Sequence, residues 1–159
     1  MPRVKHYFET GHFYHITSRT EGGVHAFATD DAKRTIVDAL SFYCRRGDLK
    51  LYAFVIMANH IHLVAQEPGA GLSHVMGNLK KWIWTQLQGA VPGVLWERRF
   101  DDNAICHVVE LKEVVQYVHN NPVRIGLVRR AEDYFWSSAR NYAGLTPVAM
   151  EIDRLVGPL

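Results

Sequence analysis

The chain has 159 residues, of which 48% are hydrophobic and 21% charged, so enough apolar surface is available for a core, and one domain over residues 1–159 is expected. A formal net charge of +2 is too small to identify a nucleic-acid partner without knowing where the charges cluster. The two cysteines, Cys44 and Cys106, argue against a disulfide framework, and no window approaches the roughly 18 consecutive apolar residues of a membrane span, so we expect a cytoplasmic protein without a membrane partner.

The first half of the chain predicts a strand, a helix and a hairpin. Residues 12–18 are rich in aromatic and β-branched side chains, which are typical of a strand. Acidic Asp30 and Asp31 suit the start of a helix, whose buried-face pattern closes near Gly47. Residues 49–57 and 60–66 then predict two strands paired through a tight turn.

The second half predicts an amphipathic helix, further strands and a final helix. Apolar residues recur at helical spacing from about Ser73 to the residues before Gly89. Residues 94–100 and 103–107 supply one or two strands, and a helix over residues 109–120 ends before Pro122. This order is that of the ferredoxin-like split βαβ sandwich, an α+β fold whose antiparallel sheet carries helices on one face. Residues 129–159 follow the last helix as a C-terminal extension.

The first candidate site is the pair His60 and His62. In a strand, residues i and i+2 point to the same side about 6.5 to 7 Å apart at the backbone, so both imidazoles can converge on one metal ion. The same pattern also suits two polar side chains on the solvent face of a half-exposed strand. The pair alone leaves both interpretations open.

The second candidate pair is Tyr117 and Asn121, which lie four residues apart across the end of the predicted last helix. Side chains at i and i+4 share a helical face, so the amide oxygen of Asn121 could ligate a metal while the phenol of Tyr117 lies beside it. His119, two residues after Tyr117, faces elsewhere. The alternative is that Tyr117 is a core or edge aromatic residue and that Asn121 only ends the helix before Pro122.

Taken together, the two pairs specify one chemistry. Two neutral imidazoles and one amide oxygen leave positions open on an octahedral ion such as Mg²⁺ or Mn²⁺, where phosphate oxygens can bind. A metal beside a phosphodiester polarises the phosphorus for attack by a phenol, which is a weak nucleophile at neutral pH. A phosphotyrosine link would keep the energy of the broken bond, so a freed 3′-hydroxyl could later rejoin the DNA. The expected reaction is transesterification rather than hydrolysis.

Five blocks of sequence stand out: YHITSR at residues 14–19, MANHIHLV at 57–64, LWERRF at 95–100, YVHNNPVR with GLV across 117–128, and YFWSS at 134–138. Together they resemble the HUH endonucleases with a single catalytic tyrosine, and within them the REP-associated tyrosine transposases related to small insertion-sequence transposases. The resemblance implies that His60 and His62 are the HUH metal ligands, that Tyr117 is the nucleophile and that Asn121 is the third ligand. Family members often have Pro where Ala58 stands and Gln where Glu97 stands, and neither change touches the inferred chemistry.

The substrate that the resemblance implies is single-stranded DNA next to a hairpin. Short basic groups in the sequence are flanked by tryptophans, an arrangement that suits phosphates and unstacked bases, although each group could also be ordinary solvated surface. The candidate DNA-binding residues are Arg19, Lys80, Lys81, Arg98, Arg99 and Arg124.

Two other functions stay open from the sequence. A ferredoxin-like sheet can serve as a non-catalytic platform for single-stranded nucleic acid, and a metal-dependent phosphodiesterase could use an activated water while Tyr117 is structural. The resemblance also covers both dimers, in which the tyrosine serves the partner's metal, and monomers that complete the site within one chain. The extension over residues 129–159 favours a monomer, with a homodimer as the alternative.

Overall fold

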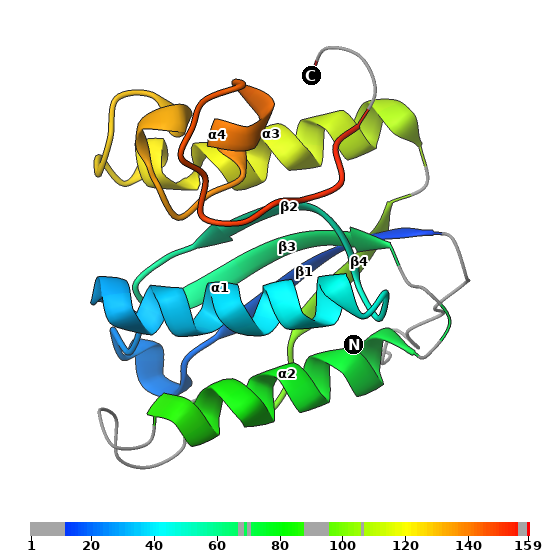
Figure 1. Ribbon diagram of the computed structural model, residues 1–159, viewed down its shortest axis with the longest axis vertical. Helices are drawn as coiled ribbons and strands as arrows, with labels where there is room; N and C mark the ends of the chain where they lie inside the picture. Colours follow the sequence, from blue (N-terminus) through cyan, green and yellow to red (C-terminus); the bar gives the residue numbers. More distant parts are fainter. Residues whose placement is uncertain (1–11, 67–68, 70, 88–95, 106, 156–158) are drawn as a thin grey trace.

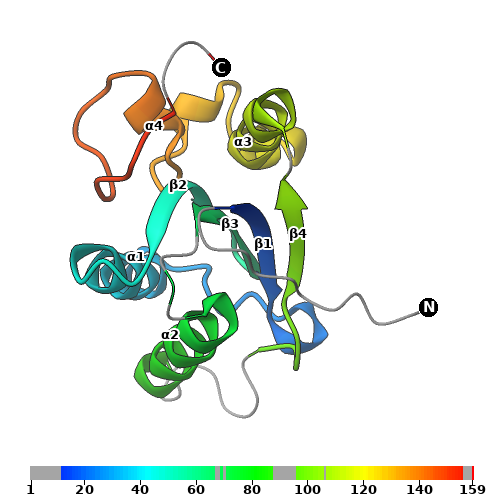
Figure 2. The ribbon, with the colours of Figure 1, turned by 90° about the vertical axis from the view of Figure 1, so that its right-hand side faces the viewer.

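The computed structural model describes residues 12–66, 69, 71–87, 96–105, 107–155 and 159 of the chain. Its elements form three layers, with a four-stranded sheet between helices on both faces (Figure 1 and Figure 2). Within these ranges, no helix is both long enough and apolar enough to cross a membrane.

The sheet has the strand order of the predicted fold. β1 (Phe13–Arg19) lies between β3 (His60–Gln66) and β4 (Asp101–Ile105), and β2 (Lys50–Ile56) lies on the outer side of β3. Every neighbouring pair of strands is antiparallel. Because α1 (Asp30–Arg45) connects β1 to β2 and α2 (Leu72–Leu87) connects β3 to β4, the prediction of a ferredoxin-like split βαβ fold is confirmed.

One face of the sheet packs against α1 and α2. Thr29 caps α1, because its side-chain oxygen accepts a hydrogen bond from the Ala32 N–H at 3.1 Å. The apolar stripes of both helices and alternate strand residues bury one cluster, which includes Ile16, Ile36, Leu40, Ile61, Leu63, Ala65, Leu79 and Ile83. Since the cluster takes every second residue of β3, His60 and His62 must point to the opposite face of the sheet.

The opposite face of the sheet packs against α3 (Val108–Arg124), as Figure 2 shows. Val55 and Val64 from the sheet and Val115 and Val118 from the helix are buried in this second apolar cluster. The helices predicted on one face are therefore α1 and α2, and the last helix lies across from them. This arrangement brings α3 to the face of β3 that carries the two histidines.

The C-terminal segment covers the outer edge of β2. The Ile56 N–H donates to the Trp136 carbonyl, and the Ser138 N–H donates to the Phe54 carbonyl, each at 2.9 Å. The Tyr134 hydroxyl adds a bond to the Ile56 carbonyl at 2.6 Å. These bonds occupy the edge groups that would otherwise be free to pair with another strand.

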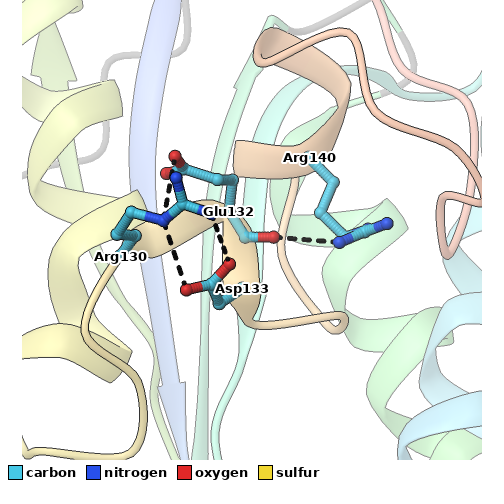
Figure 3. Close-up of polar contacts among 4 residues, drawn as sticks. All are labelled: Arg130, Glu132, Asp133 and Arg140. Carbon is cyan, nitrogen blue, oxygen red and sulfur yellow. Dashed lines mark hydrogen bonds and ion pairs between the residues drawn. The ribbon is translucent and has the colours of Figure 1, made fainter.

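The C-terminal segment contains the 3-10 helix η2 (Ala131–Asp133) and the short helix α4 (Ala139–Tyr142). Arg130 forms ion pairs with Glu132 and Asp133, and Arg140 donates to the Glu132 carbonyl at 3.0 Å (Figure 3). Arg140 also donates to the carbonyls of residues 146 and 147. Arg140 therefore connects three carbonyls of the C-terminal segment.

The boundary of the last helix differs from the prediction, because α3 does not end before Pro122 but continues to Arg124. Proline has no N–H for the carbonyl four residues earlier, which here belongs to Val118. The side-chain amide of Asn121 donates to this carbonyl at 3.3 Å and to the Tyr117 carbonyl at 3.0 Å. The asparagine thus supplies the hydrogen bond that the proline cannot make.

Of the one or two strands predicted over residues 94–100 and 103–107, the described residues form one, β4, and the described part of residues 94–100 is not a strand. Only Trp96 pairs there, with Thr20, and its indole N–H donates to the Lys80 carbonyl at 3.0 Å, which ties the indole to α2. The chain bends at residues 98–99, and the sheet strand begins only at Asp101. Residues 94 and 95 lie outside the described residues.

Candidate functional site

The candidate site lies on the sheet face that α3 covers. In the antiparallel pairing of β1 with β3, Thr17 stands opposite His62, and Arg19 stands opposite His60. Because alternate residues share a face, His15, Thr17 and Arg19 line the same surface as the two histidines.

Tyr117 of α3 meets the histidines on this surface. The ring centroids of His60 and His62 are 5.0 Å apart, and the Tyr117 ring lies 5.8 Å from the His62 ring. The His62 residue is 4% exposed, whereas Tyr117 is 43% exposed. The structure therefore brings together three of the four residues predicted for the chemistry, with the histidine buried and the phenol open to solvent.

Hydrogen bonds hold both imidazoles through the same type of ring nitrogen. Nδ1 of His62 lies 3.0 Å from His15 Nε2 and 3.0 Å from Thr17 Oγ1, and Nδ1 of His60 lies 2.7 Å from Asn59 Oδ1. Among the described residues, Nε2 of neither ring has a hydrogen-bond partner. The two Nε2 atoms are therefore the positions at which a metal could bind.

Burial keeps both imidazoles neutral. Burial, followed by the neighbouring His60 and His15, lowers the pKa of His62 to about 3. The pKa of His60 is lowered by burial and then by the positive charge of Arg19. A neutral imidazole presents a lone pair, so both rings are in the protonation state that a metal ligand needs.

Asn121 is placed differently from the histidines. It is buried on α3, where its side-chain amide donates hydrogen bonds to the carbonyls of Tyr117 and Val118. None of the described contacts joins Asn121 to His60 or His62. Its Oδ1 has no hydrogen-bond partner in the described part of the chain. No three His, Cys, Asp or Glu side chains among the described residues form a metal cluster. The donors that fit a divalent ion are thus two imidazoles, with an amide oxygen one helical turn beyond Tyr117.

His15 and Thr17 are the site residues that the sequence analysis missed. They occur in the block YHITSR, and strand alternation places them on one face together. The sequence does not reveal the register of β1 against β3, because His15 and Thr17 contact a residue, His62, that lies 47 and 45 positions further along the chain.

The four predicted arginines lie at three places. The guanidinium of Arg124 lies over the Tyr117 ring, 4.9 Å from its centroid. Arg19 forms an ion pair with Asp101 at the edge of the histidine face, and Arg98 and Arg99 are exposed in the bend before β4. Of these residues, Arg124 is the one that contacts a predicted catalytic side chain.

Lys80 and Lys81 belong to a separate groove on the α2 side of the molecule. Lys80, Lys81, Trp84 and Trp96 line this groove of about 290 Å³. The Lys80 ammonium donates to the Glu97 carbonyl at 3.2 Å and lies 5.5 Å from the centroid of the Trp96 ring. Trp84 is 38% exposed, while Trp96 is 7% exposed. The groove offers aromatic surface with a cationic border.

The family model for IS200-like transposases matches residues 9–121, a span that contains the histidine pair and the tyrosine. The chain belongs to the IS200-like transposase family. It is a transposase with DNA endonuclease activity, as the sequence analysis predicted. Enzymes of this family generally depend on a metal ion.

Two solved structures share the fold of this transposase. A REP-associated tyrosine transposase bound to a REP hairpin is 20% identical, and the match covers 96% of this chain and 93% of that chain with a TM-score of 0.78. A protein from Deinococcus radiodurans R1 that is described as a transposase is 19% identical, and that match covers 76% and 97% with a TM-score of 0.51. No curated protein matches the chain.

Proposed function

We propose that this transposase cuts and rejoins single-stranded DNA with Tyr117 as its nucleophile and with His60, His62 and Asn121 as ligands of Mg²⁺ or Mn²⁺. The observation that carries the proposal is the contact of the Tyr117 ring with His62, 5.8 Å between centroids, beside the His60 ring. A structural tyrosine would need no pair of neutral imidazoles next to its solvent-facing ring.

In the cleavage step, the Tyr117 oxygen attacks the phosphorus of the DNA backbone. A new O–P bond to the tyrosine forms, the bond from phosphorus to the 3′-oxygen breaks, and the phenol proton is transferred to this oxygen, which leaves as a 3′-hydroxyl. The 5′-phosphotyrosine keeps the energy of the broken phosphodiester, so a 3′-hydroxyl of another strand can displace the tyrosine in the reverse sense.

A divalent ion, when bound, supplies Lewis-acid polarisation of the phosphate and neutralises charge that develops in the transition state. His60 and His62 would hold it through Nε2, since hydrogen bonds occupy their Nδ1 atoms. Asn121 would offer Oδ1, which its helix bonds leave unused. Arg124, whose guanidinium lies over the Tyr117 ring, is close enough to attract the phosphate that the phenol would attack.

The proposed substrate is single-stranded DNA beside a hairpin. Support comes from the similar structure of a REP-associated tyrosine transposase bound to a REP hairpin. The groove of Lys80, Lys81, Trp84 and Trp96 supplies surface on which an unpaired base can stack. The exposed Arg98 and Arg99, together with Arg19 and Arg124, would attract the phosphates.

The enzyme is proposed to act as a monomer, as one domain of residues 1–159, in the cytoplasm. The contact of Tyr117 with His62 of the same chain supports a site completed within one chain, and the free thiol of Cys44 suits a reducing compartment. Mixing His62→Ala with Tyr117→Phe tests this. A monomeric site predicts that the mixture stays inactive, whereas recovered cleavage would mean that the tyrosine serves a partner's metal.

The decisive experiment is denaturing gel electrophoresis of the protein after reaction with a labelled DNA hairpin that carries single-stranded flanks. The tyrosine mechanism predicts a covalent protein-DNA adduct whose phosphate maps to Tyr117. Cleaved DNA without an adduct would instead indicate attack by water, and binding without cleavage would indicate a non-catalytic module.

A further inference from the structure

His62 has two neighbours for a single ring nitrogen. His15 Nε2 and Thr17 Oγ1 both lie 3.0 Å from His62 Nδ1, and both come from the adjacent strand β1. Thr17 and His62 are 6% and 4% exposed, so water cannot easily replace the Thr17 hydroxyl, whereas the His15 ring is half-buried.

The His15 and His62 rings are oriented for a hydrogen bond in the ring plane. Their planes are only 26° apart, and their centroids lie 5.2 Å apart although two of their nitrogens approach to 3.0 Å. Rings stacked face to face would have closer centroids, so these rings meet edge to edge. A ring nitrogen donates and accepts in the plane of its ring, which makes this contact a true hydrogen bond.

The direction of this bond decides whether His62 can bind a metal. A neutral imidazole carries one proton, so a metal at Nε2 requires the proton of His62 to be on Nδ1. If His15 Nε2 carried a proton and donated it to Nδ1, the proton of His62 would occupy Nε2 and block the metal. The useful arrangement therefore has His62 Nδ1 as the donor and both neighbours as acceptors.

We propose that His15 and Thr17 are positioning residues, which jointly accept the Nδ1–H of His62 and so turn its Nε2 lone pair toward the metal. This inference rests on the proposed metal role of His62. Partners of this kind typically change metal affinity by about 10- to 100-fold when they are removed. The His62 N–H has two acceptors, so removing either His15 or Thr17 leaves the other acceptor in place. Only the removal of both leaves the buried N–H without a hydrogen bond.

The experiment measures Mn²⁺ affinity of the DNA-free protein by electron paramagnetic resonance or titration calorimetry. Thr17→Val removes the hydroxyl at nearly constant volume, and His15→Phe keeps a ring without nitrogens. We expect each single change to weaken Mn²⁺ binding only a few-fold and the double change to weaken it about 10- to 100-fold. Thr17→Ser in the His15→Phe background keeps a hydroxyl at this position, so its Mn²⁺ affinity should match that of the His15→Phe single variant rather than that of the double change to valine and phenylalanine. Thr35→Val, on α1 across the sheet from the histidines, removes a hydroxyl that donates to the Asp31 carbonyl; it is the matched control and should leave Mn²⁺ affinity unchanged.

A second measurement needs no metal. Nitrogen NMR of the histidine rings in metal-free protein should find the His62 proton on Nδ1 in the wild type and a shift toward Nε2 in the double variant. Wild-type Mn²⁺ affinity in a folded double variant would overturn the inference while leaving the proposed function intact. If wild-type Mn²⁺ binding did not depend on His60 and His62, the proposed metal site would fail, and the inference would fail with it.

Discussion

Replacing Tyr117 by phenylalanine should separate chemistry from stability. The ring is 43% exposed, and its hydroxyl makes no hydrogen bond among the described residues. Phenylalanine keeps the ring contacts with His15 and His62 and the position under the Arg124 guanidinium. The free energy of unfolding should therefore change by no more than about 0.5 kcal/mol, as is usual for surface substitutions. Cleavage and the covalent adduct should disappear, because the attacking oxygen is gone.

Tyr134→Phe provides the matched control with the opposite pattern. The Tyr134 hydroxyl donates to the Ile56 carbonyl at 2.6 Å, and burial raises the pKa of Tyr134 to about 12, which keeps the donor protonated. Loss of this bond should cost about 0.5 to 1.5 kcal/mol. For a protein of this size, each kcal/mol corresponds to roughly 2 to 4 °C in Tm. Cleavage by Tyr134→Phe should stay at the wild-type level.

Three assays compare Tyr117→Phe and Tyr134→Phe with the wild type. They measure thermal unfolding, affinity for a hairpin oligonucleotide with single-stranded flanks, and adduct formation on a denaturing gel. The proposal predicts that Tyr117→Phe binds and folds like the wild type without forming an adduct. An adduct in Tyr117→Phe would show that another residue is the nucleophile. Wild-type cleavage by Tyr117→Phe without any adduct would refute the tyrosine mechanism altogether.

Three further predictions concern the metal, the groove and the pH dependence of folding. Chelation by EDTA, or the double change of His60 and His62 to alanine, should abolish cleavage in a folded protein, and added Mn²⁺ should rescue only the chelated wild type. Trp84→Ala should weaken single-stranded DNA binding by about 1 to 3 kcal/mol in a titration, whereas Trp82→Ala, on the same helix but outside the groove, should have a much smaller effect. Burial lowers the pKa of His119 to about 4, below its usual 6.5, so the unfolded chain binds a proton more readily and folding stability is complete above pH 6.5 and declines as the pH falls toward 4. Part of this decline belongs to His62, whose pKa burial lowers to about 3, so the decline in His119→Gln should be smaller than in the wild type by about 3 kcal/mol when urea unfolding is measured at several pH values in EDTA. An unchanged slope in this variant would contradict the assignment.

The sequence predicted those features that depend on short-range periodicity. The alternation of β3 placed His60 and His62 on one face, and helical spacing placed α1 and α2, because both patterns follow from local backbone geometry. Contacts between distant segments could not be predicted from the sequence, because no local pattern determines that Thr17 stands opposite His62. The end of α3 was misjudged for a similar reason, since Pro122 normally stops a helix and only the Asn121 side chain offsets its missing N–H.

The position of Tyr117 depends on both faces of α3. Two residues after Tyr117, His119 turns away from the histidine pair and hydrogen-bonds Ser138 Oγ at 2.7 Å. The Phe54 N–H donates to the same Ser138 oxygen at 2.9 Å, so this oxygen joins α3 to β2. The segment that covers the β2 edge thereby also fixes the helix that carries Tyr117. Because the helix is held from its buried side, the Tyr117 phenol stays exposed to solvent. His62, beneath it, is kept neutral by burial, and this combination is what the proposed single-chain site requires.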